Sequence, residues 1–314
     1  GAAARVLPAR RRVLRKIHEA ELTCIASAGG QGAPLPRGLV AVGTADGYVK
    51  LLCSETGRPH AQLSVSKDLP RLVALSLSQA TGLLLAAASD SALRLLDLRA
   101  HRLLHVLRGH RGALTACGFL GSDNHAFTAS ADKTVKLWDL ETGQPLRSIP
   151  ASGAVTGAAV DPATGAIAAG HADGSLAVWD PRASGAVSVP AASHRGHSIV
   201  GVCMSPDGQS LLSQAEDGSV CTTALGMMRA LLALDGLGPV SGPSPPAWSP
   251  DGRHLLARGA DSVGCWSADT GDEAHVHEAP GTVCVCWERP EAASAHRDGH
   301  VALWGAAEHA RAQG

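Results

Sequence analysis

Short apolar runs of four to eight residues recur along the whole chain, and each is bounded by Gly, Asp, Asn or Pro. Residues 126–130 and 134–138 are two such runs on either side of a short polar turn. Runs of this length with turn residues at both ends are typical of β-strands. No stretch shows the 3.6-residue period of an amphipathic helix. The pattern therefore predicts an all-β protein made of short antiparallel strands.

A turn with a central Asp separates two apolar runs at near-constant intervals. The seven aspartates are Asp46, Asp90, Asp132, Asp173, Asp217, Asp261 and Asp298. Their spacings of 44, 42, 41, 44, 44 and 37 residues indicate seven copies of one structural unit. Trp138, Trp179 and Trp304 each follow their Asp by six residues, and Trp266 follows its Asp by five. Four of the six tryptophans thus belong to the repeat.

The third unit is the most complete. Gly109-His110 opens it, and strands are expected at residues 113–120, 126–130, 134–139 and 146–149. Two further turns, Ser205-Pro206-Asp207-Gly208 and Ser249-Pro250-Asp251-Gly252, have Pro and Gly where tight turns favour them. Each unit is therefore interpreted as a small sheet of consecutive strands.

The motifs of the third unit resemble the WD-repeat family. Gly109-His110, Ser130-Ala131-Asp132 and Leu137-Trp138-Asp139 carry the resemblance, and Val178-Trp179-Asp180 and Leu303-Trp304-Gly305 are weaker copies. The resemblance covers nearly the whole chain and implies an all-β, seven-bladed β-propeller of four-stranded antiparallel blades around a channel.

The blade boundaries follow from the spacing of the repeats. We expect a basic linker at residues 1–12, a single propeller domain at 13–305 and a tail at 306–314. The blades are expected at residues 19–67, 68–108, 109–151, 152–193, 194–236, 237–279 and 280–305. A strand at residues 13–17 is expected to complete the last blade, because closing the ring with both ends of the chain removes open sheet edges.

The resemblance also implies a structural role for the residues that look most like catalytic ones. His110, Ser130, Asp132 and Trp138 are expected to form a buried hydrogen-bonded tetrad in which the Ser hydroxyl meets the indole N–H. Such a network satisfies polar groups that would otherwise be buried without partners. The first unit keeps His18, Thr44 and Asp46, and the fifth keeps His197 and Asp217. The second unit has no such His, and we expect it to depend on apolar packing.

The composition narrows the function classes. Hydrophobic residues make up 45% of the 314 residues, which excludes wholesale disorder. Twenty-seven Lys and Arg against 28 Asp and Glu argue against a globally basic nucleic-acid binder. No apolar run approaches the length of a membrane helix. Most of the eight Cys lie in apolar runs, so we expect a reducing, cytoplasmic environment.

Motifs of catalytic chemistry are not found. The sequence has no phosphate-binding Gly-rich loop, no Gly-x-Ser-x-Gly and no His-Glu-x-x-His. Cys284 with Cys286, and His275 with His277, have the spacing of side chains on one strand face. Core thiols and edge imidazoles are the favoured interpretation, with a metal site as the alternative. No cofactor, metal or catalytic residue is predicted.

The resemblance implies a non-catalytic platform that binds proteins or peptides through its loops, within a monomeric ring that is part of a longer chain. The candidate binding face consists of Glu19, Tyr48, Lys67, Asp68, Arg111, Lys133, His194 and Arg195.

A basic cluster near the N-terminal end supports one alternative. It consists of Arg10, Arg11, Arg12, Arg15 and Lys16. This cluster is compatible with contact to tubulin, in a component of microtubules, centrioles or cilia, or it is a solvated linker. A propeller enzyme with an axial site is the third hypothesis, and the small apolar residues expected to face the channel at 72–78 and 154–160 argue against it.

Overall fold

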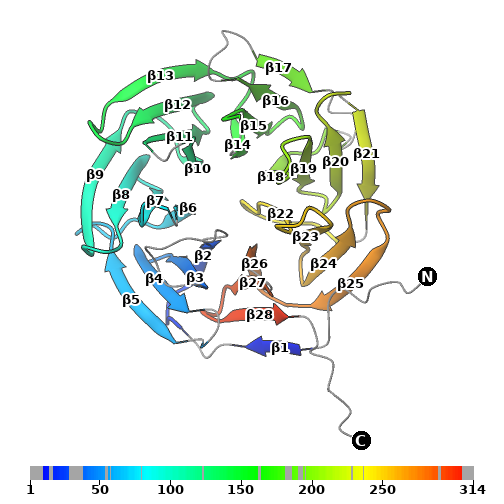
Figure 1. The fold of residues 1–314 in the computed structure, drawn as a ribbon, viewed down its shortest axis with the longest axis horizontal. Coiled ribbons are helices and arrows are strands. Elements are labelled where there is room, and N and C mark those ends of the chain that lie inside the picture. The colour runs from blue at the N-terminus through cyan, green and yellow to red at the C-terminus, as the bar shows by residue number, and fades with distance from the viewer. Residues whose placement is uncertain are drawn as a thin grey trace, which may run out of the picture.

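The structure is a closed ring of seven four-stranded antiparallel sheets (Figure 1). This computed structural model describes residues 10–13, 17–27, 38–53, 56, 58–78, 80–121, 124–161, 164–180, 186–189, 194, 196–227, 229–235, 237–288 and 291–305. In each of the first six blades the first strand lies at the centre of the ring and the fourth at its rim. The predicted all-β seven-bladed propeller is confirmed.

Blades one to six each use four consecutive strands. Blade one contains β2 (Leu22–Ser27), β3 (Leu39–Thr44), β4 (Tyr48–Cys53) and β5 (Pro59–Ser64). Blade two contains β6 (Leu72–Leu77), β7 (Leu83–Ala88), β8 (Ala92–Asp97) and β9 (Arg102–Arg108). Blade three contains β10 (Leu114–Leu120), β11 (His125–Ser130), β12 (Thr134–Asp139) and β13 (Pro145–Pro150).

The next three blades follow the same order. Blade four contains β14 (Val155–Val160), β15 (Ile167–His171), β16 (Leu176–Trp179) and β17 (Ala186–Val189). Blade five contains β18 (Ile199–Met204), β19 (Ser210–Ala215), β20 (Val220–Ala224) and β21 (Arg229–Leu234). Blade six contains β22 (Ala247–Trp248), β23 (His254–Arg258), β24 (Ser262–Ser267) and β25 (Glu273–Glu278).

Blade seven joins the two ends of the described chain. It contains β26 (Thr282–Glu288), β27 (Glu291–His296), β28 (Val301–Gly305) and, as its outermost strand, β1 (Arg10–Val13). Arg10 pairs with Gly305 and Val13 with Ala302. The closing strand therefore lies earlier than the predicted 13–17, and Arg10, Arg11 and Arg12 belong to a sheet rather than to a linker.

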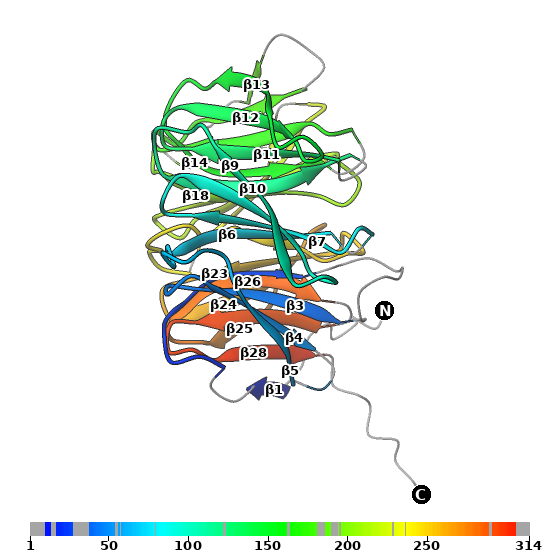
Figure 2. The same ribbon diagram turned by 90° about the vertical axis from the view of Figure 1, so that its left-hand side faces the viewer.

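The antiparallel order gives the ring two different faces (Figure 2). Turns between the first and second strands, and between the third and fourth, end on one face, which we call the hairpin face. Turns between the second and third strands end on the other, together with the connections that join blades, and we call this the loop face. All seven repeated aspartates lie in second-to-third-strand turns, so they line the loop face.

The core lies between adjacent blades rather than at one centre. The second strands β3 and β15 are buried along their whole length, whereas β13 at the rim buries only Ile149. Small residues let the blades converge, because a Cβ on Gly170 of blade four would lie 2.4 Å from Ile199 of blade five. The second strand of each blade is thus covered on both faces, which explains its continuous apolar run.

Blade six departs from the common pattern. The first and second strands of the other six blades all show a register shift near the start of the pair, for example between Leu114 and Ala116. In blade six, β22 is two residues long and its pairing with β23 shows no shift.

The described residues include no helix long and apolar enough to cross a membrane.

Candidate functional site

Blade three contains a continuous hydrogen-bonded network at the loop face. Trp138 Nε1 donates to Thr128 Oγ1 at 2.8 Å, and Thr128 Oγ1 lies 2.7 Å from His110 Nε2. His110 Nδ1 lies 2.8 Å from Asp132 Oδ2, and Thr134 Oγ1 donates to Asp132 Oδ1 at 2.6 Å. The network therefore runs from Trp138, near the end of β12, across β11 to the turn that contains Asp132.

The hydroxyl of this network belongs to Thr128, and the prediction of Ser130 was wrong. Trp138 pairs with Ala126, so Thr128 is its diagonal neighbour, whereas Ser130 pairs with Thr134 at the far end of β12. Four residues of a strand span about 13 Å, which is beyond the reach of an indole. Ser130 Oγ instead accepts a hydrogen bond from the Asp132 amide at 3.1 Å.

The electrostatics of the network fix its protonation. Desolvation raises the pKa of Asp132, but hydrogen bonds from Thr134, from the Arg111 amide and from His110 outweigh it and lower this pKa to about 2. Burial lowers the pKa of His110, although Asp132 opposes that shift. An ionised Asp132 can only accept, so His110 Nδ1 donates to it and the neutral Nε2 accepts from Thr128. Every proton is thus assigned to a structural bond.

Blades one and five also have an imidazole near their second-to-third-strand turn. In blade five, His194 is fully buried, with Nδ1 at 2.8 Å from Ser219 Oγ and Nε2 at 2.8 Å from Ser213 Oγ. The prediction of His194 as a binding-face residue was therefore wrong. His197, predicted to be the network residue, is half-exposed and 3.8 Å from Asp217. In blade one, His18 lies 3.4 Å from Asp46.

Other blades place a different group beside the same turn. His171 of β15 and His296 of β27 are buried side chains from the second strand of blades four and seven. In blade two, buried Arg94 donates to both oxygens of Asp90, at 2.9 and 2.6 Å. This ion pair corrects the prediction that blade two depends on apolar packing alone.

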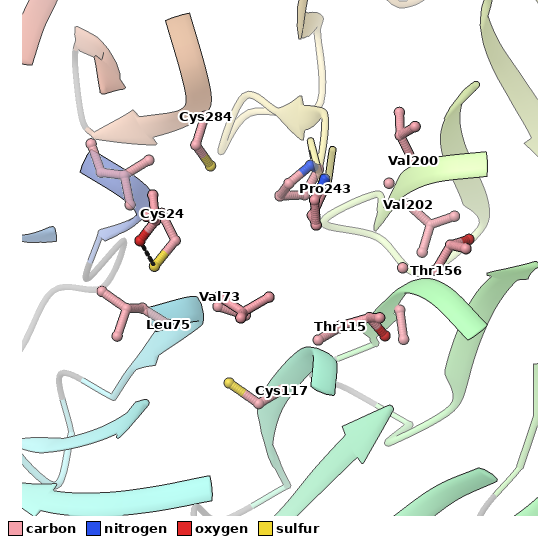
Figure 3. A pocket seen from close by; sticks show the side chains of 18 residues that line it. Cys24, Val73, Leu75, Thr115, Cys117, Thr156, Val200, Val202, Pro243 and Cys284 are labelled. Atoms are coloured by element: carbon pink, nitrogen blue, oxygen red, sulfur yellow. Dashed lines mark hydrogen bonds between the residues drawn. The ribbon is translucent and has the colours of Figure 1, made fainter. Parts of the chain in front are cut away.

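The central channel holds a cavity of about 160 Å³ (Figure 3). The innermost strands line it, and the side chains of Cys24, Cys117 and Cys284 are among those around it. Burial raises the pKa of the Cys117 thiol to about 12, so this thiol is protonated at neutral pH. Within the described chain, neither a carboxylate nor an imidazole lines the cavity. No three described His, Cys, Asp or Glu side chains are grouped so that they could hold a metal.

The channel mouth on the loop face brings together charged residues from three blades. Glu21 precedes β2 of blade one, and its Oε2 lies 3.0 Å from Arg71 of blade two. Glu21 Oε1 lies 2.9 Å from Arg297 of blade seven. Hydrogen bonding from Arg71 and the charges of both guanidinium groups lower the pKa of Glu21, against desolvation. A pocket of about 300 Å³ adjoins this cluster, with Thr23 and Ser241 among its other lining residues.

A buried cation lies behind this pocket. The Arg258 guanidinium donates to Ser244 Oγ at 2.7 Å, to the Thr282 carbonyl at 2.9 Å and to the Ser241 carbonyl. No described carboxylate lies within ion-pair distance of it, and Glu21 is the one carboxylate among the described residues that line the pocket. Among the described residues that line the pocket, two guanidinium groups thus face one carboxylate, and Arg258 is hydrogen-bonded to the lining residue Ser241.

Comparison with known proteins agrees with this architecture. The model of the WD domain, G-beta repeat, matches residues 101–139, 143–180 and 188–222. Each of these matches begins at or near the rim strand of one blade and continues into the next blade. β1 shows the same offset between repeat and blade, because it precedes blade one in the sequence but is the rim strand of blade seven. The chain is thus a seven-bladed β-propeller that contains WD repeats.

Relatives of this WD-repeat propeller are longer proteins. It is 27% identical to protein tipD of Dictyostelium discoideum over 91% of this chain and 47% of that protein. It is 28% identical to Autophagy-related protein 16 of Arabidopsis thaliana over 70% of this chain and 44% of that protein. It is 27% identical to WD repeat-containing protein 90 of Xenopus tropicalis over 68% of this chain and 12% of that protein. The chain thus spans less than half the length of these relatives.

The predicted face residues of the WD-repeat propeller fall into separate groups. Arg111 and Lys133 are exposed and lie on either side of the Asp132 turn, because the Arg111 amide donates to Asp132 at 3.0 Å. Glu19, Lys67 and Asp68 are also exposed, in the segments that precede β2 and β6. All five lie on the loop face, but the first two belong to blade three and the other three to the segments before blades one and two.

The remaining predicted residues have other positions. Tyr48 is half-buried, and its ring centroid lies 5.9 Å from that of His18, so it supports blade one. Arg15, Lys16 and Arg195 lie outside the described residues.

The charged cluster of Glu21, Arg71 and Arg297 was missed by sequence reasoning. The sequence does place two of its members at equivalent positions, since Glu21 and Arg71 each directly precede the innermost strand of a blade.

Proposed function

We propose that this WD-repeat propeller is a non-catalytic protein-interaction platform that receives an acidic segment of a partner protein at the channel mouth. The observation that carries the proposal is the convergence of Arg71 and Arg297 on a single carboxylate, Glu21, beside a pocket of about 300 Å³. Buried Arg258 adds to the positive charge behind that pocket.

The charge balance supports an acidic ligand. Arg71 and Arg297 are 49% and 69% exposed, so both guanidinium groups keep donors available to an incoming group. A guanidinium binds carboxylates in a planar, two-donor geometry, which suits Glu or Asp side chains. The apolar and uncharged lining of the cavity below supports binding rather than acid–base chemistry.

The test uses a fluorescein-labelled acidic peptide, an octamer of alternating Glu and Ala, titrated with the protein and followed by fluorescence anisotropy. The double variant Arg71→Gln, Arg297→Gln should weaken binding roughly fivefold to tenfold, since two partly exposed ion pairs are lost. Arg102→Gln is the matched control, because Arg102 is an exposed arginine at the start of β9, next to the hairpin-face turn of blade two.

Charge reversal at Arg111 and Lys133 tests how far the acidic segment extends over the loop face. Arg111→Glu with Lys133→Glu should weaken binding further if the segment passes over blade three. If the Arg71→Gln, Arg297→Gln double variant bound the peptide as tightly as the wild type, the channel mouth would not be the binding site.

We also propose that this platform acts in autophagy, supported by the similarity to Autophagy-related protein 16 of A. thaliana over most of this chain. Cells that lack the protein should degrade long-lived proteins more slowly during starvation. The wild-type gene should restore that rate, and the Arg71, Arg297 double variant should not. Normal degradation in the deleted cells would contradict this part of the proposal.

A further inference from the structure

A second concave surface lies on the hairpin face, between blades five and six. Its volume is about 430 Å³, and it is formed by turns of both blades and by residues of their outer strands. Three carboxylates line it, from Asp207 of blade five and from Asp251 and Asp269 of blade six. Apolar surface comes from Leu231, which is 51% exposed, and from Trp248. We call this surface the acidic groove.

The repeat itself explains why two carboxylates meet there. The turns Ser205-Pro206-Asp207-Gly208 and Ser249-Pro250-Asp251-Gly252 are identical in sequence and occupy the same position in adjacent blades. In each turn the Asp Oδ1 accepts from the Ser hydroxyl and from the backbone amide two residues further on. Those bonds use one oxygen of each carboxylate, so the charge of the other oxygen is available to a ligand.

The floor of the groove contains a polar group without a partner. Thr222 is 1% exposed, lines the groove, and its Oγ1 has no hydrogen-bond partner in the described structure. Trp248 Nε1, also on a lining residue, is likewise unpartnered. Buried polar atoms are rarely left unsatisfied, so an unpartnered pair beside a groove indicates a place where a ligand supplies the missing bonds.

The charges around the groove favour a cation. None of the three carboxylates lies within ion-pair distance of a described Lys, Arg or His side chain. Exposed Arg253 and half-buried His254 lie beside Asp251. Burial lowers the pKa of His254, so this imidazole is neutral at pH 7. Three negative charges thus face one permanent positive charge.

We propose that the acidic groove binds an extended segment of a partner protein in which Lys or Arg alternates with apolar residues. Side chains of an extended segment alternate between two sides. Its basic side chains then face Asp207, Asp251 and Asp269, and its apolar side chains pack on Leu231 and Trp248. This site is on the opposite face from the channel mouth and does not depend on it.

The test uses the fluorescein-labelled peptide Gly-Leu-Lys-Val-Arg-Leu-Lys-Gly and a control peptide with Glu in place of each Lys and Arg. The basic peptide should bind with saturation, more weakly as salt rises from about 0.05 M to 0.5 M, and the acidic control should not bind at the groove. The double variant Asp207→Asn, Asp251→Asn should weaken binding of the basic peptide roughly tenfold, since two ion pairs are lost. Asn keeps the oxygen that each turn needs, so the turns are preserved.

Asp139→Asn is the matched control. Asp139 also accepts two backbone amides in a hairpin-face turn, but that turn is in blade three. Its substitution should leave the affinity for the basic peptide unchanged.

Methyl NMR locates the peptide. Binding should shift the signals of Leu231 and Thr222, which line the groove, and leave those of Val73 and Val283 at the channel mouth unchanged. Equal affinity of the double variant and the wild type, or shifts confined to Val73 and Val283, would overturn the proposal. Failure of the acidic peptide at the channel mouth would leave this result unaffected, so the two sites are tested separately.

Discussion

Blades two and three hold the same Asp turn with different chemistry. In blade three, a neutral imidazole and a hydroxyl connect Asp132 to the indole of Trp138. In blade two, the guanidinium of Arg94 binds Asp90 directly, and Leu96 stands where blade three has Trp138. Both arrangements keep an ionised carboxylate at the turn, since hydrogen bonds from Arg94 lower the pKa of Asp90 as those from Thr134 lower that of Asp132.

The difference shows what the fold requires. In both of these blades the carboxylate at the loop-face turn accepts a backbone amide and also a buried donor from its own blade. The donor is Arg94 in blade two and His110 in blade three. A repeat without the His and Trp residues of blade three can therefore still hold its Asp turn. The two donors do differ in how they respond to loss of a partner and to pH.

The largest effect is expected from Arg94→Leu. It leaves Asp90 without its buried partner and should lower the free energy of unfolding by about 3 kcal/mol, at the low end for a buried pair because Asp90 is 29% exposed. Arg108→Leu is the control, since Arg108 is 66% exposed and 3.8 Å from the same carboxylate, and it should cost less than about 0.5 kcal/mol. Urea unfolding measures both, and equal effects would mean that the buried bond is not what stabilises blade two.

A smaller effect is expected from Thr128→Val in blade three. The change leaves Trp138 Nε1 and His110 Nε2 without partners and should cost about 2 kcal/mol. Ser130→Ala removes a single acceptor for one amide and should cost about 1 kcal/mol or less. If Ser130→Ala proved the more destabilising substitution, the hydroxyl of the network would be assigned to the wrong residue.

Blade architecture was predictable from the sequence because it depends on short-range features. Asp at near-constant spacing and strand-length apolar runs are local signals, and each blade is made of consecutive strands. Choosing between Thr128 and Ser130 requires the strand register, and choosing between His194 and His197 requires the path of the chain before β18, because the candidates differ by only two or three residues. The meeting of Glu21, Arg71 and Arg297 could not be predicted, since it depends on three blades converging at one channel mouth.

The smallest effect is a difference in pH response between the two blades. Burial lowers the pKa of His110 in the folded state, so the unfolded chain takes up a proton first as pH falls below about 6.5, and blade three loses stability over that range. The Arg94–Asp90 pair stays ionised there, because the pKa of Asp90 is lowered. Hydrogen exchange at pH 7 and pH 5, corrected for intrinsic rates, should show lower protection of β11 and β12 at pH 5 and unchanged protection of β7 and β8. Equal changes in both blades would contradict this account.

The pairing of β1 with β28 makes blade seven the seam of the molecule. Arg10 and Gly305 are adjacent in space and almost the whole chain apart in sequence, whereas blades one to six close within about forty residues each. On the ribosome, six blades have all their strands before the seventh can form, and β1 must wait unpaired until residues 301–305 emerge. Closure of the ring therefore depends on one contact of very large sequence separation, which carries the largest loop-closure entropy in the molecule.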